Sequence, residues 1–227
     1  ILLLTAVVTR GSATMYYVNY VLLRPELVFA FIVSGMVASL SGALLSERLL
    51  GKFDRVRAYQ WTIISFVIFG TLIFFIPPSQ VWLIFVLNIV FSFIQKLTTP
   101  LQWTMFSDVV DYEEHRSGRR LDGLVFSTAL FAIKFGLALG GAVVGWVLGM
   151  VDYAPGQANQ APHVLATINA LFTLIPCVLF LCMVALLAIY KLNSRLVDTI
   201  ARELASKRDI RNDAGQLSPA TQSAIQE

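Results

Sequence analysis

Two lysines lie deep inside long apolar stretches of the sequence, where a charged side chain is costly and usually functional. Lys134 stands about twelve residues after Asp122, which is about 18 Å along a helix and close to the middle of a membrane. An ammonium group at that depth suits a polar cavity, in which it can bond substrate hydroxyls or pair with a carboxylate. The alternative is a buried ion pair that only fixes packing. We favour a substrate-binding role for Lys134.

Lys96 is the second deep lysine, and polar residues accompany it along the chain. Gln95, Thr99 and Gln102 are spaced i, i+4 and i+7, which places them on one face of a helix. A polar stripe on a membrane helix usually faces a cavity or another helix. Contact with a ligand and plain hydrogen bonding between helices both fit this pattern, and both stay open.

Arg10 and Tyr17 are the candidates in the first apolar stretch. The guanidinium of Arg10 can hold a substrate hydroxyl or carboxylate, or it can reach the cytoplasmic interface if the helix begins near Ile1. Tyr17, together with Tyr16 and Tyr20, offers ring faces and hydroxyls that suit a sugar. Tyrosines near a helix end also form interfacial belts, so this signal is ambiguous by itself.

Charged residues crowd the end of the fourth apolar stretch. Asp108 and Asp111 are three residues apart and therefore share one helix face. Arg120 and Asp122 follow, and Arg48 belongs to the same side of the membrane. Opposed carboxylates and guanidiniums here can form a gate at the cytoplasmic mouth. The alternative is ordinary loop charge, worth about 0–1 kcal/mol per exposed pair.

The elements that must hold these residues are membrane helices. Hydrophobic residues make up 57% of the 227-residue chain and charged residues only 14%, against about 25% in soluble domains. About 20 apolar residues cross a bilayer, and barrel strands would alternate every second residue, which these stretches do not. We therefore predict an all-α integral membrane bundle over residues 1–192, with helices at roughly 1–23, 26–47, 57–76, 80–107, 122–150 and 163–190.

Lysine and arginine alternate between the loops, which sets the orientation. They concentrate between the second and third stretches, between the fourth and fifth, and in the tail 193–227, so these regions and the C-terminus should be cytoplasmic. The tail reads as partly amphipathic, with Leu196, Ile200 and Leu204 four residues apart, and then disordered. The formal charge of +3 reflects these loops and gives no reason to expect nucleic acid.

Cysteine and glycine carry structural information only. Cys177 and Cys182 are about 140° apart around a helix, so they cannot bridge each other, and no spacing resembles a metal site; no cofactor is expected. Several glycines of the fifth stretch repeat at small-xxx-small spacing, which predicts close helix packing. They are Gly136, Gly140, Gly141, Gly145 and Gly149. The chain opens inside an apolar run without an initiator Met, which we interpret as a segment of a longer protein.

Two segments resemble a known family. The loop Gly51-Lys52-Phe53-Asp54-Arg55-Val56-Arg57 resembles the basic motif that the major facilitator superfamily places between helices 2–3 and 8–9. Thr99-Pro100-Leu101-Gln102-Trp103, Ser107 to Tyr112, Arg120 and Lys134-Phe135-Gly136 resemble the glycoside–pentoside–hexuronide:cation symporters, the family of melibiose permease. The resemblance covers the whole chain as helices 7 to 12 of twelve. Arg10-Gly11 to Tyr16-Tyr17 resembles the branch for α-xylosides such as isoprimeverose.

The resemblance implies roles residue by residue. Lys134 matches the helix 11 lysine tied to sugar binding and cation coupling, and Thr99 stands where melibiose permease has its helix 10 tryptophan. Lys96 has no counterpart. The matches at the cytoplasmic gate are Asp108, Asp111, Arg120 and Arg48, with Asp122 in place of a glutamate.

The predicted function is cation-coupled sugar symport across a bacterial inner membrane by alternating access. The partners would be a sugar or glycoside, the lipid bilayer and an N-terminal six-helix half that binds most of the coupling H⁺ or Na⁺. The rival is a membrane scaffold or lipid-handling protein, which has no need of Lys96 and Lys134.

Overall fold

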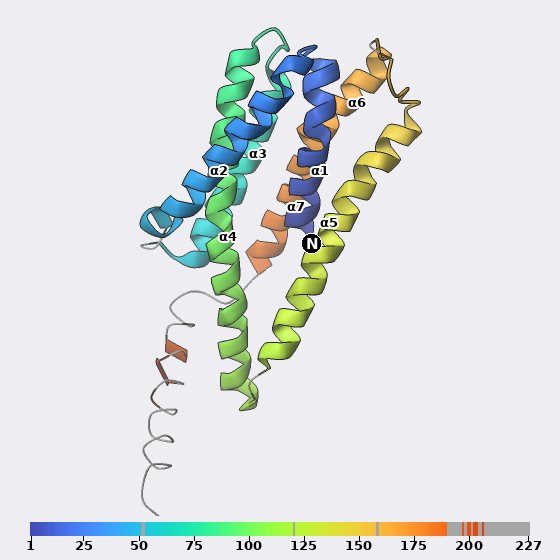
Figure 1. Cartoon of the computed structure of the whole chain (residues 1–227). Coiled ribbons are helices and arrows are strands. Elements are labelled where there is room, and N and C mark those ends of the chain that lie inside the picture. The colour runs from blue at the N-terminus through green and yellow to red at the C-terminus, as the bar shows by residue number, and fades with distance from the viewer. Residues whose placement is uncertain are drawn as a thin grey trace, which may run out of the picture.

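The computed structural model describes residues 1–50, 53–119, 121–157 and 159–189, together with 197, 199, 200, 202, 203 and 206. Every regular element within these residues is a helix (Figure 1). Arg120, Lys52 and most of the predicted tail lie outside the described residues. The elements in chain order are α1 (Leu2–Tyr16), η1 (Tyr17–Val21), η2 (Pro25–Leu27), α2 (Val28–Leu50), α3 (Arg55–Phe75), α4 (Val81–Ser117), α5 (Asp122–Met150), α6 (Pro162–Phe172) and α7 (Leu174–Ile189).

Five helices of the described chain are long and apolar enough to cross a membrane. They cover Pro25–Ser46, Arg55–Phe75, Val81–Ser117, Asp122–Met150 and Pro162–Ile189. The first predicted helix falls short because α1 has only 15 residues before its hydrogen bonding changes to a π-helical turn, η1. The prediction of an all-α membrane protein is confirmed. The sequence predicted six spans, and five helices of the described chain meet the length and hydropathy that a span requires.

The helices run alongside one another in alternating directions (Figure 1). α2 packs mainly on α4, α1 packs on α5 and on the α6–α7 pair, and α3 packs on α4 and α7. Phenylalanine and tyrosine rings dominate the buried contacts. One cluster surrounds Tyr17, Phe31 and Phe172, and a second surrounds Phe66 and Phe180.

Two glycines bring α5 against α1. A Cβ at Gly140 would lie 2.7 Å from the Cβ of Val8 and 2.9 Å from the carbonyl oxygen of Thr5. Gly136 is equally close to the start of α1. The packing prediction is confirmed for these two glycines. Among the described residues Gly141, Gly145 and Gly149 pack on no other helix, because a Cβ there would meet nothing within 4 Å. One face of α5 is packed and another is open within the chain.

The α6–α7 span is broken near Thr173, whose φ and ψ are −118° and −68°. Pro176 explains the break, because proline has no N–H to donate to the carbonyl four residues earlier and its ring clashes there. That carbonyl belongs to Phe172, which is fully buried. A helical donor is therefore missing at Phe172 in the interior of the bundle.

The end of the bundle that holds the α4–α5 turn carries the charged loops. α4 has 37 residues, which is about 56 Å along the axis and well beyond a bilayer core of about 30 Å. It ends at Gly118, which adopts a φ of 69°. Ile200 of the predicted amphipathic tail is buried, and Glu203 lies 3.6 Å from His115 of α4. Leu196 and Leu204 lie outside the described residues.

Candidate functional site

A cavity of about 710 Å³ lies between α1, α2 and α4. The α2 side is largely apolar, with Ile32, Met36 and Leu40. The α4 side is polar, and its residues recur every three or four positions, so that they share one helix face. We refer to this face as the α4 wall; it consists of Asn88, Ser92, Gln95, Lys96 and Thr99. α1 contributes Val7, Arg10, Gly11 and Thr14.

The cavity gathers part of the predicted substrate-binding set. Arg10, Gln95, Lys96 and Thr99 all line it, although they come from two helices far apart in the sequence. Gln102 is half-buried one turn beyond Thr99 and is not among the lining residues. The roles of these residues remain predictions.

The guanidinium of Arg10 lies inside the bundle, where hydrogen bonds and aromatic rings fix its position. Its side chain donates from Nη1 to the Phe172 carbonyl at 2.8 Å and from Nη2 to Oδ1 of Asn88 at 3.2 Å. The guanidinium carbon lies 3.9 Å and 4.1 Å from the ring centroids of Phe172 and Phe91. Two aromatic faces and two carbonyl-type oxygens therefore stabilise the charge. The suggestion that Arg10 reaches the cytoplasmic interface is wrong, because the residue is 5% exposed and points inward.

Arg10 also satisfies the backbone carbonyl that the break between α6 and α7 leaves without a donor. Pro176 leaves the Phe172 carbonyl without its helical donor, and Nη1 of Arg10 supplies the missing hydrogen bond. Two threonines of α1 bond to α5 in the same way: Thr5 and Thr9 donate to the carbonyls of Gly136 and Gly140 at 3.4 Å and 3.2 Å. We call this set of contacts the α1 seam; it joins Thr5, Thr9 and Arg10 to Gly136, Gly140 and Phe172.

Tyr17 lies outside the cavity. It is 1% exposed, and its ring stacks on Phe172 with centroids 4.3 Å apart. The other two tyrosines of the first stretch meet Tyr153 of the α5–α6 loop. Tyr16 and Tyr20 both pack edge-on against the Tyr153 ring, and the Tyr153 hydroxyl donates to that of Tyr20 at 2.9 Å. Within this chain the tyrosines tie α1 and η1 to neighbouring elements.

Lys134 lies on α5 and does not line the cavity. Its side chain is exposed, and it stands two positions before Gly136, which packs on α1. Two residues are about 200° apart around a helix, so Lys134 lies on the side of α5 opposite the α1 seam. It faces outward from these helices, and its depth in the membrane stays a prediction.

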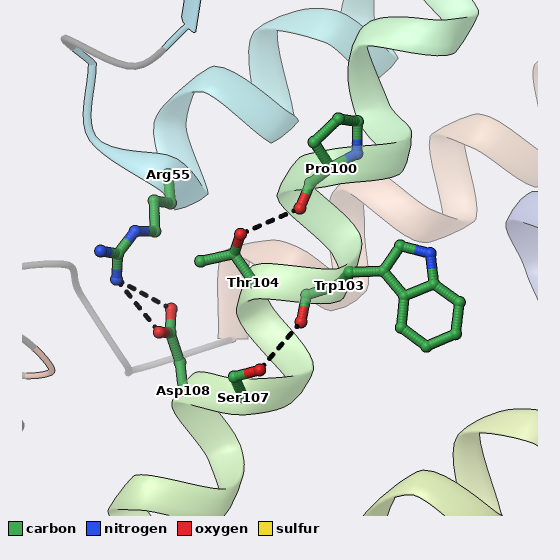
Figure 2. Close-up of polar contacts among 6 residues, drawn as sticks. All are labelled: Arg55, Pro100, Trp103, Thr104, Ser107 and Asp108. Atoms are coloured by element: carbon green, nitrogen blue, oxygen red, sulfur yellow. Dashed lines mark hydrogen bonds and ion pairs between the residues drawn. The ribbon is translucent and has the colours of Figure 1, made fainter. Parts of the chain in front are cut away.

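An ion pair joins α3 and α4 at the charged end. Nη1 of Arg55 lies 3.0 Å and 3.3 Å from the two carboxylate oxygens of Asp108 (Figure 2). The Asp108 side chain is 13% exposed and that of Arg55 is 33% exposed. Asp54 fixes the start of α3, because its carboxylate accepts from the Arg57 N–H at 3.0 Å. Thr104 and Ser107 bond back to their own helix in the same view (Figure 2).

Sequence reasoning placed Asp108 in an ionic network but did not single out Arg55. The signal is present in the loop Gly51 to Arg57, which the sequence analysis uses for the family resemblance and for topology but not for a contact with Asp108. Arg48 is exposed at the end of α2, and Asp111 and Asp122 are half-buried. Arg120 is outside the described residues, so its predicted place in the gate stays a prediction. Asn88 stands among the polar residues of this stretch in the sequence but was not predicted to bind substrate, and Ser92 was not predicted at all; both line the cavity and extend the α4 stripe by two turns.

Comparison with known proteins adds an independent finding. The sequence family described as MFS/sugar transport protein matches residues 1–194. The chain is 51% identical over 207 residues to the "Putative glycoside/cation symporter YagG" of Escherichia coli (strain K12), covering 91% of this chain and 45% of that protein. It is 36% identical to the "Inner membrane symporter YicJ" of the same organism, covering 88% and 44%. The chain thus spans about half the length of the curated relatives it matches.

Proposed function

The chain belongs to the MFS/sugar transport protein family, and we propose on that premise that the whole protein is a cation-coupled sugar symporter. The names of its relatives, a glycoside/cation symporter and an inner membrane symporter, support this activity. They also support a place in a bacterial inner membrane. A scaffold or lipid-handling role is not favoured, because it explains neither these relatives nor the polar α4 wall.

One observation carries the proposal: the cavity combines the polar α4 wall with a largely apolar α2 side. A sugar ring has the matching form, with apolar faces and a rim of hydroxyls. Ser92, Gln95 and Thr99 offer hydroxyl and amide groups that both donate and accept hydrogen bonds, as sugar hydroxyls do. The volume of about 710 Å³ falls in the range of about 300–1,000 Å³ common for small-molecule sites.

The bundle corresponds in this proposal to six membrane spans, the C-terminal half of a twelve-helix transporter. The sixth span is α1 together with η1, which cover 15 and 5 residues and so extend about 30 Å along a helix. An N-terminal half would face the cavity and Lys134, and it would supply most of the groups that bind H⁺ or Na⁺. The two halves would rock about the midplane site.

Two sets of residues have distinct roles in this scheme. Lys134 and the cavity residues would bind the sugar, and Gln102 would contribute only after a change in the angle of α4. The charged end would close the cytoplasmic mouth through Asp108 and Arg55, with Arg48, Asp111, Arg120 and Asp122 around them. The C-terminal tail would lie on that same cytoplasmic side.

The test measures the uptake of labelled glycosides into membrane vesicles that contain the full-length protein. A Na⁺ gradient, a proton gradient and no gradient are imposed in turn, and ionophores that collapse each gradient serve as controls. We expect accumulation of at least one glycoside above its outside concentration with one gradient only. Equal equilibration under all three conditions would contradict coupling, and no uptake of any sugar would contradict the proposed function.

A further inference from the structure

Asn88 of the α4 wall is only 6% exposed, yet one end of its amide group has no partner among the described residues. Its Oδ1 accepts from Nη2 of Arg10 at 3.2 Å, whereas Nδ2 donates to no other described residue. Among the described side chains, the only fully enclosed polar atom without a partner is Oδ1 of Asn169, so Nδ2 of Asn88 is open to the cavity that this residue lines. Two N–H groups inside the bundle therefore need an acceptor that enters the cavity.

The chemistry of Arg10 decides which end of the Asn88 amide faces the cavity. A guanidinium has only N–H donors, so the atom of Asn88 beside it is the oxygen. Arg10 is itself fixed by its bond to the Phe172 carbonyl at 2.8 Å and by the aromatic rings on both of its faces. The amide cannot turn over without setting donors against donors. Nδ2 of Asn88 is therefore a donor with a fixed direction.

The α2 side leaves this donor uncovered at Gly35. A Cβ at Gly35 would lie 3.4 Å from Nδ2 of Asn88 and 3.1 Å from Oγ of Ser92, so both polar atoms lie close to the same point beside α2. All three residues line the cavity, and Gly35 has no side chain to cover the other two. Oγ of Ser92 likewise forms no hydrogen bond with another described residue. A fixed amide donor and a free hydroxyl thus meet in one part of the cavity.

We propose that Asn88 and Ser92 form a subsite for one hydroxyl of the sugar, in which Nδ2 of Asn88 donates to the hydroxyl oxygen. This inference rests on the proposed function and assigns a specificity-determining residue to that site. A sugar hydroxyl suits the pair because it accepts from Nδ2 and exchanges a second hydrogen bond with Ser92. A site built in this way rejects an analogue without the hydroxyl, because its own enclosed polar groups are then left unpaired.

The rival is a permanent partner for Nδ2, either a water molecule or a group from another part of the protein. A permanent partner makes Asn88 a structural residue, and a change at this position then affects every ligand alike. Ligand contact makes the effect depend on one particular hydroxyl of the sugar. The two cases differ in selectivity and not only in affinity.

Asn88→Asp separates the two bonds of the amide. The carboxylate still accepts from Arg10, so the fold should be kept, but an acceptor replaces the donor that faces the cavity. The probes are methyl β-xyloside and methyl β-glucoside, with their deoxy and deoxyfluoro derivatives at each ring hydroxyl. Fluorine accepts weakly and cannot donate, whereas a hydroxyl can turn and donate to the new carboxylate. Binding to the full-length protein in detergent is measured by calorimetry.

The expected result is a loss that is confined to one position of the sugar. Asn88→Asp should weaken the derivative fluorinated at that position about tenfold more than it weakens the parent glycoside, because two acceptors then oppose each other. Derivatives fluorinated elsewhere should keep the wild-type ratio to the parent. Ser92→Ala leaves the bond between Arg10 and Asn88 in place. It should weaken the parent about threefold or more and leave the derivative that is deoxy at the same position unchanged.

Gln80→Glu is the matched control, because it makes the same change from amide to carboxylate at the exposed start of the same helix. It should leave every affinity unchanged. Equal losses for the parent and all derivatives in Asn88→Asp, or no loss at all, would overturn the subsite while leaving symport intact. If Asn88→Asp does not fold, an unchanged affinity of Ser92→Ala for the parent overturns it instead. Failure of wild type to bind or accumulate any of these glycosides would contradict the proposed function itself.

Discussion

The two polar regions on either side of α1 differ in how their groups are satisfied. In the α1 seam, Arg10, Thr5 and Thr9 give hydrogen bonds to buried carbonyls of α5 and α6. On the α4 wall, Lys96 and Thr99 are exposed to an open cavity. Both regions look alike in the sequence, as polar residues inside apolar stretches. A deep polar residue is therefore a ligand candidate only where the fold leaves it facing open space.

The largest effect should come from Lys134, the exposed cation on the far side of α5 from the seam. We expect Lys134→Ala in the full-length protein to abolish gradient-driven sugar uptake, because it removes the charge assigned to the transport site. Expression and the Tm in detergent should stay close to those of wild type, since Lys134 points away from the helices on which α5 packs in this chain. Vesicle uptake normalised to the amount of protein measures this. Normal uptake would remove Lys134 from the site.

Arg10→Met should differ from Lys134→Ala, because its main effect should be a loss of stability of the folded protein. It removes charged hydrogen bonds to the Phe172 carbonyl and Asn88, at a cost of about 3 kcal/mol or more in unfolding free energy. Thermal and denaturant unfolding of the purified protein measure the loss.

A second substitution tests the cause of the Arg10 effect. Pro176→Ala restores an N–H four residues after Phe172, so Arg10→Met should destabilise less in that background than in wild type. Identical losses in the two backgrounds would show that the Phe172 carbonyl is not what Arg10 satisfies.

The glycine pair of α5 tests whether the seam is tightly packed. Gly140→Ala places a Cβ 2.7 Å from Val8, so we expect a loss of about 1–3 kcal/mol of unfolding free energy. Gly141→Ala is the matched control on the next residue, where a Cβ meets nothing within 4 Å, and its stability should be unchanged or slightly raised. Equal effects of the two substitutions on the Tm would contradict the packed and open faces of α5.

The ion pair of Arg55 and Asp108 should give the smallest effect. It is partly exposed, so its contribution is about 1 kcal/mol, or about a fivefold change in a conformational equilibrium. Asp108→Asn should shift the protein towards the inward-open form and slow transport without a comparable loss of sugar binding. Cysteine labelling from the cytoplasmic side measures the shift. A collapse of binding with unchanged labelling would assign Asp108 to the substrate site instead.

The sequence predicted the class of the fold well because apolar length is a local property. The stretches around α2, α3, α4 and α5 were found in this way, since each is about 20 residues or more without an interior charge cluster. The internal structure of the first span was not predicted, because the π-helical turn at Tyr17–Val21 does not change the hydrophobicity of the sequence. Pro176 signals the break at Thr173, but the sequence analysis predicted one continuous helix over this stretch.

The candidate site was predicted less well because its geometry depends on pairs of helices. Spacing placed Gln95 and Thr99 on one face of α4, yet spacing within one helix cannot say that Arg10 would join them in one cavity. It also could not say that Tyr17 would turn into the core against Phe172. The partner of Asp108 was missed for the same reason, since Arg55 lies 53 residues away in sequence.

Protection from chemical labelling tests whether the α4 wall lines the sugar pathway. A single cysteine is placed at Thr99 on the wall, or at Thr104 on another face of the same helix, in a full-length background without other reactive cysteines. Saturating transported sugar should slow labelling of Thr99→Cys severalfold and leave Thr104→Cys unaffected. Equal labelling rates of Thr99→Cys with and without the sugar would contradict the account.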